Sequence, residues 1–298
     1  MAKNLISVLQ LGTLDYTTGL RLQEKLVALR KEGRIGDVLL LLEHSPVITL
    51  GRNAKAKNIL GSPELLAERG VEVHECDRGG DVTFHGPGQL VAYPIFDLRG
   101  FPSANPARNT LGAVEYVRRL EEVLIGTCAD FGIPAQRIPG LTGVWTGEDA
   151  RLSTISGDVQ PTTARVGTGA LICREESKTQ QISSREESKI AALGVHISRA
   201  VTSHGIALNV NTDLSFFNLI VPCGITSRRV TSMQKELSRT LLLRDVAHAL
   251  SRNFGIVFAS QILWLESLDA LLGTTLDIPM KPPENLRKLH GKDDGAWA

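Results

Sequence analysis

Residues 78–90, with the sequence Arg-Gly-Gly-Asp-Val-Thr-Phe-His-Gly-Pro-Gly-Gln-Leu, constrain the fold more than any other stretch of this chain. Four glycines and a proline in thirteen residues are more than packing alone requires. Glycine adopts positive φ angles and lets another group approach the main chain closely. Arg78, Thr83 and His85 add a cation, a hydroxyl and an imidazole to the same stretch. A tight hairpin that merely carries polar residues is the alternative, and two later segments favour a ligand-binding loop instead.

Length and charge limit the class of protein. The chain has 298 residues, of which 42% are hydrophobic and 22% charged, which is typical of a globular protein with one large domain or two small ones. A net charge of +1 gives no reason to expect a nucleic acid or an acidic membrane as the main partner. No stretch approaches the roughly 20 apolar residues of a membrane span, and the first residues do not resemble a signal peptide. We therefore expect a cytoplasmic protein.

The four cysteines are Cys76, Cys128, Cys173 and Cys223. They are widely spaced and form no C-x-x-C pair, which argues against a zinc site or a disulfide framework. The sequence therefore predicts neither a bound metal nor a cofactor, and a function for any one cysteine has to come from its local context.

Helices and strands alternate in the predicted secondary structure. Apolar spacing and capping residues predict helices at 15–31, 62–70, 109–128, 231–254 and 264–272. The helix at 231–254 begins at a capping box formed by Thr231 and Gln234, and it ends before Gly255. Within the helix at 109–128, Val114 and Cys128 are expected on the buried face. Short apolar runs predict strands at 37–42, 47–50, 71–76, 90–96, 138–145, 189–197 and 202–211.

Residues 147–188 form a polar segment that interrupts this pattern. Arg174-Glu-Glu-Ser-Lys178 is repeated there as Arg185-Glu-Glu-Ser-Lys189, and the repeat is too short and polar for a solenoid unit. We expect a mobile insertion, with a short strand possible at 166–173. The predicted organisation is one domain over residues 1–260, interrupted at about 147–188, and a C-terminal extension over 261–298.

Four segments in this order resemble the lipoyl(octanoyl) transferase family. They are the glycine-rich loop, Lys189-Ile-Ala-Ala-Leu-Gly-Val195, Ser203-His-Gly-Ile-Ala-Leu-Asn-Val210 and Pro222-Cys-Gly-Ile225. The stretch at 39–52 also resembles this family and the related biotin and lipoate ligases. The resemblance covers about residues 11–258 apart from the insertion. It implies a biotin/lipoate protein ligase-like catalytic domain, of α/β (α+β) class, with a mixed β-sheet flanked by helices.

The resemblance also implies a reaction. Members of the family move an octanoyl group from octanoyl-acyl carrier protein to the target lysine of lipoyl domains, the first step of endogenous protein lipoylation. The acceptors are lipoyl domains of 2-oxoacid dehydrogenase E2 subunits and the glycine cleavage H protein. By the matching motifs, Cys223 and Lys189 are the catalytic pair. The substrate-binding positions are Arg78, Gly79, Gly80, Asp81, Val82, Thr83, Phe84, His85, Ala192, Leu193, Gly194, Gly205, Ile206 and Ala207.

The implied pair makes chemical sense. A thiolate is the nucleophile that would carry the acyl group as a thioester, and a neighbouring ammonium stabilises it. In the second half-reaction, the acceptor lysine has a pKa of about 10.4 and must lose a proton, for which Lys189 is the expected base. Lys178 ends the first copy of the repeat, but only Lys189 is followed by the family strand. His85 either orients the acyl carbonyl or makes a structural hydrogen bond.

Two other functions remain open from the sequence. An ATP-dependent lipoate or biotin ligase of the same fold would share the glycine-rich loop and the strand lysine. The segment 222–224 favours the transferase, because adenylate chemistry needs no thiol there. The third possibility is a carrier-domain binding protein that has lost its activity.

Overall fold

The computed structural model describes residues 4–105, 107–108, 110–147, 187–221 and 229–272. Most of the polar segment at 147–188, including the strand predicted at 166–173, lies outside the described residues. So do Cys223 and Lys178.

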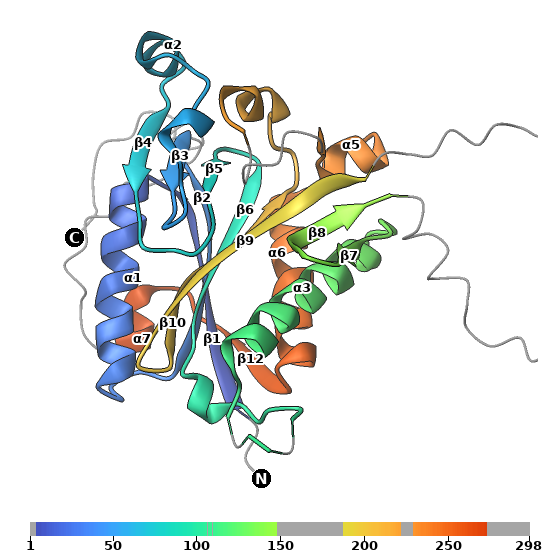
Figure 1. Ribbon diagram of the computed structural model, residues 1–298. Helices are drawn as coiled ribbons and strands as arrows, with labels where there is room; N and C mark the ends of the chain where they lie inside the picture. The colour runs from blue at the N-terminus through green and yellow to red at the C-terminus, as the bar shows by residue number, and fades with distance from the viewer. Residues whose placement is uncertain (1–3, 106, 109, 148–186, 222–228, 273–298) are drawn as a thin grey trace, which may run out of the picture.

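A mixed nine-stranded sheet forms the centre of the molecule (Figure 1). Its strands follow the order β12 (Ser260–Trp264), β1 (Asn4–Leu14), β2 (Asp37–His44), β6 (Gln89–Ile95), β10 (Val201–Asn209), β9 (Ser188–Ser198), β8 (Leu141–Thr146) and β7 (Gln136–Ile138), while β11 (Arg229–Val230) also pairs with β9. Strand β1 is parallel to both of its neighbours. The pairs from β2 through to β7 are antiparallel. The predicted mixed sheet is therefore confirmed.

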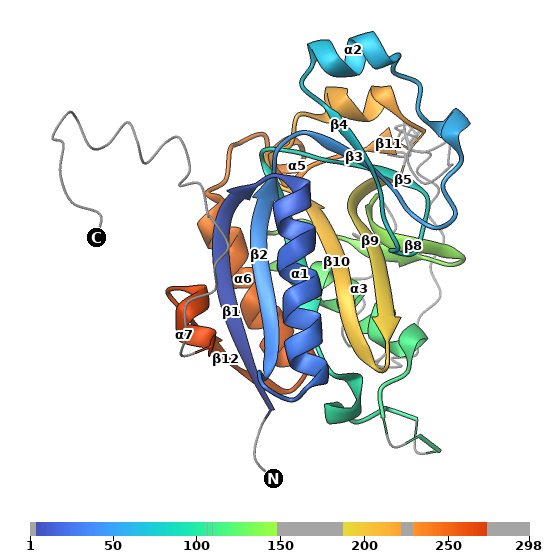
Figure 2. The ribbon, with the colours of Figure 1, turned by 90° about the vertical axis from the view of Figure 1, so that its left-hand side faces the viewer.

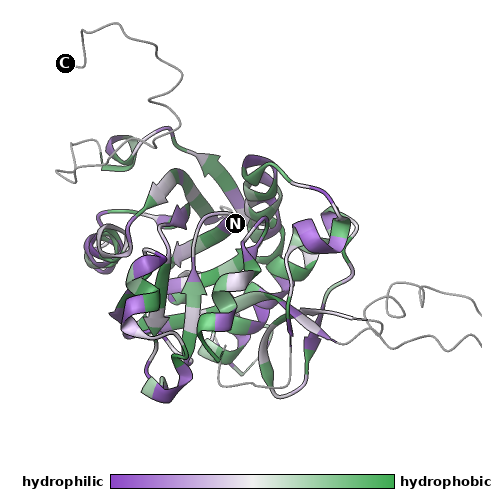
Figure 3. Ribbon diagram, turned by 90° about the horizontal axis from the view of Figure 1, so that it is seen from above, coloured by the Kyte–Doolittle hydropathy of each residue, from purple (hydrophilic) through white to green (hydrophobic). Residues whose placement is uncertain are grey.

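Helices cover both faces of this sheet. Helix α1 (Tyr16–Lys31) packs on one face, and α3 (Ala113–Asp130) and α6 (Leu243–Val257) pack together on the other (Figures 1 and 2). Asp15 caps α1 by accepting from the amide of Thr18, and Leu22 and Leu26 bury its inner face. Seen from above, hydrophobic residues gather on the strands between the helices (Figure 3). Within the described ranges, no helix is long and apolar enough to cross a bilayer.

The predicted buried face of α3 is correct at its end and wrong at its start. Cys128 is fully buried, as expected, whereas Val114 is 77% exposed. The buried face runs through Tyr116, Leu120 and Leu124, and successive helical residues are about 100° apart. A residue two positions before Tyr116 consequently points to solvent.

A second, three-stranded sheet lies beside the large one. Its order is β4 (Glu72–Glu75), β3 (Val47–Leu50) and β5 (Val82–His85), and it packs near α2 (Pro63–Glu68) and the 3-10 turn η3 (Leu214–Leu219). Two further 3-10 turns cover Ala56–Asn58 and Leu98–Gly100. The stretch at 78–90 is thus only partly a loop, because β5 within it is a buried strand.

Several C-terminal elements differ from expectation. Ser232, not Thr231, caps a short helix, α5 (Met233–Leu237), and α6 is a separate helix that continues past Gly255 to Val257. Residues 260–264 form the edge strand β12, and within the predicted 264–272 helix the helical part is α7 (Leu268–Leu272). The domain boundaries stay a prediction, although β12 crosses residue 260 and pairs with β1.

The hairpin of β9 and β10 is confirmed as two strands with a tight connection. Arg199 and Ala200 form its two-residue turn, and both have positive φ angles, of 50° and 66°. Positive φ at both central residues matches the right-handed twist of the two strands. The hairpin pairs the two glycine-bearing strands, so that Gly194 on β9 lies opposite Gly205 on β10.

Candidate active site

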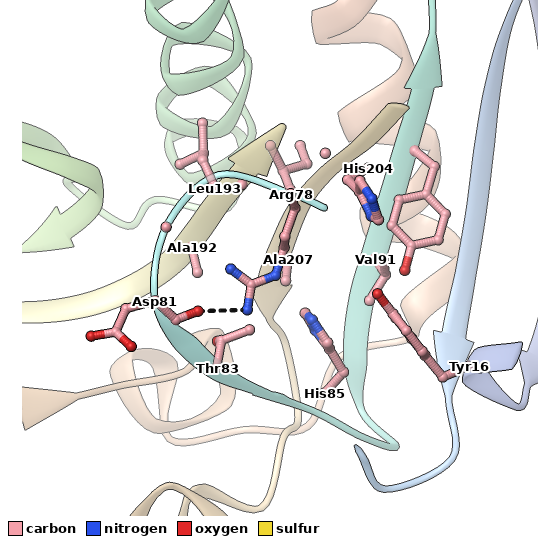
Figure 4. A pocket seen from close by; sticks show the side chains of 15 residues that line it. Tyr16, Arg78, Asp81, Thr83, His85, Val91, Ala192, Leu193, His204 and Ala207 are labelled. Atoms are coloured by element: carbon pink, nitrogen blue, oxygen red, sulfur yellow. Dashed lines mark hydrogen bonds between the residues drawn. The ribbon is translucent and has the colours of Figure 1, made fainter. Parts of the chain in front are cut away.

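Most of the predicted substrate-binding residues line one pocket (Figure 4). The glycine-rich stretch and the β9–β10 hairpin form its walls, although these segments lie more than a hundred positions apart. The predicted residues that line it are Arg78, Gly80, Asp81, Thr83, His85, Ala192, Leu193, Gly194, Gly205, Ile206 and Ala207.

Glycines allow the pocket walls to approach each other. Gly194 and Gly205 lie directly opposite each other in the β9–β10 register. A Cβ atom at Gly194 would lie 2.8 Å from the carbonyl oxygen of Gly79, and one at Gly205 would collide with the carbonyl oxygen of Ala92. Both strand glycines therefore allow a close approach, and the approaching group is backbone.

Three predicted residues do not line the pocket. Val82 and Phe84 belong to the core of the small sheet, where the Phe84 ring stacks on Phe216 with centroids 4.7 Å apart. Strand alternation explains this, because Thr83 and His85 on the same strand face the pocket. Gly79 joins the loop to β9 instead, since its amide donates to the carbonyl of Val195 at 3.0 Å.

Arg78 is a buried cation that fixes the shape of the loop. Its guanidinium donates to the carbonyl oxygens of Thr49 at 2.7 Å, Asp81 at 2.8 Å and Gly79 at 3.0 Å, and to the Thr49 hydroxyl. Among the described residues, no carboxylate lies within ion-pair distance of it. The Asp81 carboxylate points away and accepts from the Asn58 amide at 2.6 Å. Arg78 thus leaves a positive charge in the pocket wall.

His85 makes a structural hydrogen bond. Its Nδ1 lies 2.7 Å from Oε1 of Gln89, and the Gln89 amide nitrogen donates to Oδ1 of Asn209 at 2.9 Å. Burial lowers the pKa of His85 to about 3. The imidazole is accordingly neutral near pH 7, and because the Gln89 oxygen can only accept, Nδ1 carries the proton.

Four lining residues were not predicted as substrate-binding: Tyr16, Val91, Tyr93 and His204. In the predicted strand at 90–96, alternation places Val91 and Tyr93 on the same face. The sequence therefore groups these two residues, but it does not show that their face lines a pocket. Tyr16 comes from the first turn of α1, and no sequence motif connects it with the glycine-rich loop.

Lys189 is buried beside the pocket rather than in its lining. It is 7% exposed, and its Nζ lies 5.2 Å from the centroid of the Trp145 ring on β8. Ala192, three residues further along β9, is the nearest predicted acyl-binding residue in the sequence. Lys189 therefore lies at the end of the pocket that Ala192 forms.

The two sides of the segment that carries Cys223 are held at this end. Before it, the amide of Val221 donates to the carbonyl of Asn58 at 2.8 Å. After it, β11 pairs with β9 so that Val230 lies opposite Lys189, and the amide of Thr231 donates to the Lys189 carbonyl at 2.9 Å. The described residues that flank the segment are therefore anchored, one side to Asn58 and the other to the strand that bears Lys189.

Comparison with known proteins identifies the family. Residues 15–255 match the model of the lipoyl protein ligase A/B catalytic domain. The chain belongs to this family. Among relatives in the family, a protein named octanoyltransferase from Koribacter versatilis (strain Ellin345) is 56% identical over 97% of this chain and 98% of its own length. An octanoyltransferase from Acidobacterium capsulatum is 53% identical over 90% of this chain and 96% of its own. The resemblance found in the sequence is confirmed.

Solved structures of lipoate ligases share the fold. A bipartite lipoate protein ligase from Thermoplasma acidophilum aligns with a TM-score of 0.59, 16% identity, and coverage of 89% of this chain and 87% of that one. A lipoate-protein ligase A bound with ATP aligns with a TM-score of 0.57 and 15% identity, over 89% of each chain. At such identities the likeness shows the fold alone, and this confirms the predicted ligase-like catalytic domain.

Proposed function

We propose that this chain is an acyltransferase that moves an octanoyl group from octanoyl-acyl carrier protein to the target lysine of lipoyl domains, through a thioester on Cys223. The observation that carries the proposal is the convergence of distant predicted acyl-binding segments on one pocket. It is supported by 56% identity, over 97% of the chain, to a relative named octanoyltransferase.

In the first half-reaction, the Cys223 thiolate attacks the carbonyl carbon of the donor thioester. The bond from that carbon to the carrier sulfur breaks, and the carrier leaves as a thiol after taking a proton. One thioester replaces another, so the step is nearly balanced and needs no ATP. The positive charge of Arg78 in the pocket wall favours the negative charge that develops on the carbonyl oxygen.

In the second half-reaction, the amine of the acceptor lysine attacks the acyl-cysteine. An amide bond forms, the bond to the cysteine sulfur breaks, and the amine proton passes to Lys189 and then to solvent. A base is required because the free amine is the nucleophile, whereas an ordinary lysine is protonated at neutral pH. Formation of an amide from a thioester drives the sequence forward.

The pocket suits an unbranched acyl tail. Val91, Ile206 and Ala207 give it apolar walls, and the strand glycines let neighbouring backbone pack closely around these walls. Each buried methylene contributes about 0.8 kcal/mol, so an eight-carbon chain gains several kcal/mol there. We place the reaction in the cytoplasm, with E2 lipoyl domains and the glycine cleavage H protein as acceptors.

The experiment that tests this function compares two donors. The enzyme is incubated with an apo lipoyl domain and either octanoyl-acyl carrier protein without ATP, or octanoic acid with ATP and magnesium. Octanoylated lipoyl domain in the first reaction alone is the expected result. Product in the second reaction alone would show that the chain is a ligase, and product in neither would favour the binding protein.

A further inference from the structure

His204 lies between the acyl pocket and a second cavity. The second cavity is bounded by α1, residues 76–77 and the β9–β10 hairpin, with Gln23 and Val27 among its lining residues. His204 is the one described residue that lines both cavities. In the close view it stands at the opposite side of the acyl pocket from Ala192 and Asp81 (Figure 4).

Two hydrogen bonds hold His204 in an unusual backbone conformation. Its φ angle is +54°, which is uncommon for a residue other than glycine. Its amide donates to Oε1 of Gln23 at 2.7 Å, and its Nε2–H donates to Oδ1 of Asp77 at 2.6 Å. Such conformations persist where the surroundings enforce them, and they cluster at functional sites. The imidazole is therefore fixed in place rather than free to swing aside.

The direction of the acyl chain follows from the strand register. Lys189 precedes Ala192 on β9, so the carbonyl end of the chain belongs at the Ala192 end of the pocket. His204 lies opposite Val195, three residues beyond Ala192. At about 3.3 Å per residue this separation is about 10 Å, close to the extended length of an eight-carbon chain. The last carbons of the chain consequently arrive at the imidazole.

We propose that His204 is the end wall of the acyl pocket and sets the length of the acyl group that the enzyme transfers. The inference rests on the proposed function, and it adds a residue that determines which acyl-chain lengths the enzyme accepts. A longer tail would need the second cavity, whose walls include the aliphatic side chains of Leu20 and Val27. Burial lowers the pKa of the His204 imidazole, which keeps the ring neutral against an apolar tail.

The test measures kcat/KM for transfer from octanoyl-, decanoyl- and dodecanoyl-acyl carrier protein. His204→Gly removes the ring, and glycine accepts the positive φ angle without strain. We expect the decanoyl-to-octanoyl ratio to rise about fifteenfold, because decanoyl has two more methylenes and each newly buried methylene is worth about a factor of four. In the double variant His204→Gly/Val27→Phe, the added ring fills the second cavity, so the ratio should return toward the wild-type value. Val27→Phe alone should leave octanoyl transfer unchanged.

A folded His204→Gly enzyme with an unchanged chain-length ratio would overturn the inference. His204→Asn is a second variant, since asparagine tolerates this backbone region and is shorter than histidine. It should shift the ratio in the same direction by a smaller factor, and no shift in either variant would also overturn the inference. Wild-type protein that transfers no acyl group at all would overturn the proposed function as well. Normal octanoyl transfer by the His204 variants, with an unaltered decanoyl-to-octanoyl ratio, would overturn only the proposal that His204 is the end wall.

Discussion

The ammonium nitrogen of Lys189 on β9 lies 5.2 Å from the centroid of the Trp145 ring, its cross-strand neighbour on β8. A cation over an aromatic face gains about 0.5–2 kcal/mol, depending on its exposure to water. The contact restrains a long side chain that would otherwise have many rotamers. It also fixes the lysine on the strand that pairs with β11, just after the segment that bears Cys223.

Replacement of Lys189 should remove most of the transfer activity. Lys189→Met keeps the length and apolar stem of the side chain but cannot accept a proton. We expect the rate to fall by about 10²–10⁴, the usual contribution of a positioned general base. The matched control is Lys178→Met in the first copy of the repeat, which should be nearly silent. The reverse pattern would assign the catalytic role to the other copy.

Gly143 should be required for the position of the lysine. A Cβ atom there would lie 2.5 Å from Cε and 3.1 Å from Nζ of Lys189. Gly143→Ala should therefore reduce transfer at least tenfold by displacing the ammonium group. Gly140→Ala is the control, because Gly140 also has a positive φ angle but no neighbour within 4 Å of the added carbon. Equal activity in the two variants would show that the space beside Lys189 is unimportant.

Gly205 should be required for stability. A Cβ atom at this position would collide with the Ala92 carbonyl oxygen and lie 2.7 Å from Cδ of Pro94. Gly205→Ala should lower the free energy of unfolding by about 1–3 kcal/mol or more, as overpacking of a core does. Urea denaturation measures the change. Gly36→Ala, which meets nothing within 4 Å, should leave stability nearly unchanged, and a similar loss in both would contradict the packing account.

Stability should fall as the pH decreases from about 6.5 to 4. Burial lowers the pKa of His44 to about 4, whereas an unfolded histidine titrates near about 6.5. Between these values the unfolded state binds a proton that the folded state does not, so the free energy of unfolding rises with pH in this window.

His44 alone should account for about 2 kcal/mol of the loss between pH 7 and pH 5. His44→Gln removes the titrating group, so this variant should lose less stability than wild type over the same interval. Urea denaturation at the two pH values measures both losses. Equal losses would mean that His44 does not stay neutral in the folded protein.

Local sequence patterns predicted much of the fold. The helix predicted at 15–31 and the β9–β10 hairpin depend on neighbours close in the chain, and the structure confirms both. The patterns failed where long-range contacts decide. Strand β12 is short and lies at the sheet edge, and it exists because β1 offers a parallel partner more than two hundred positions away.

The candidate site shows the same division. The motifs of the family resemblance assigned the glycine-rich loop and the β9–β10 hairpin to one binding site. In the structure, residues of both segments line one pocket. The motifs could not show that Thr83 faces the pocket whereas Phe84 faces the core. That difference arises because β5 is a strand, whose successive side chains point to opposite faces. They also gave no role to Tyr16 or to the wall position of His204, which only the packing of α1 against the hairpin creates.

The intact mass of the enzyme after reaction with octanoyl-acyl carrier protein, in the absence of an acceptor, tests the central claim most directly. We predict one added octanoyl group, located on Cys223 by peptide mapping, removed on addition of a lipoyl domain, and absent from Cys223→Ser. Transfer to the lipoyl domain at the full rate by Cys223→Ser, with no acyl group on the wild-type enzyme, would contradict it.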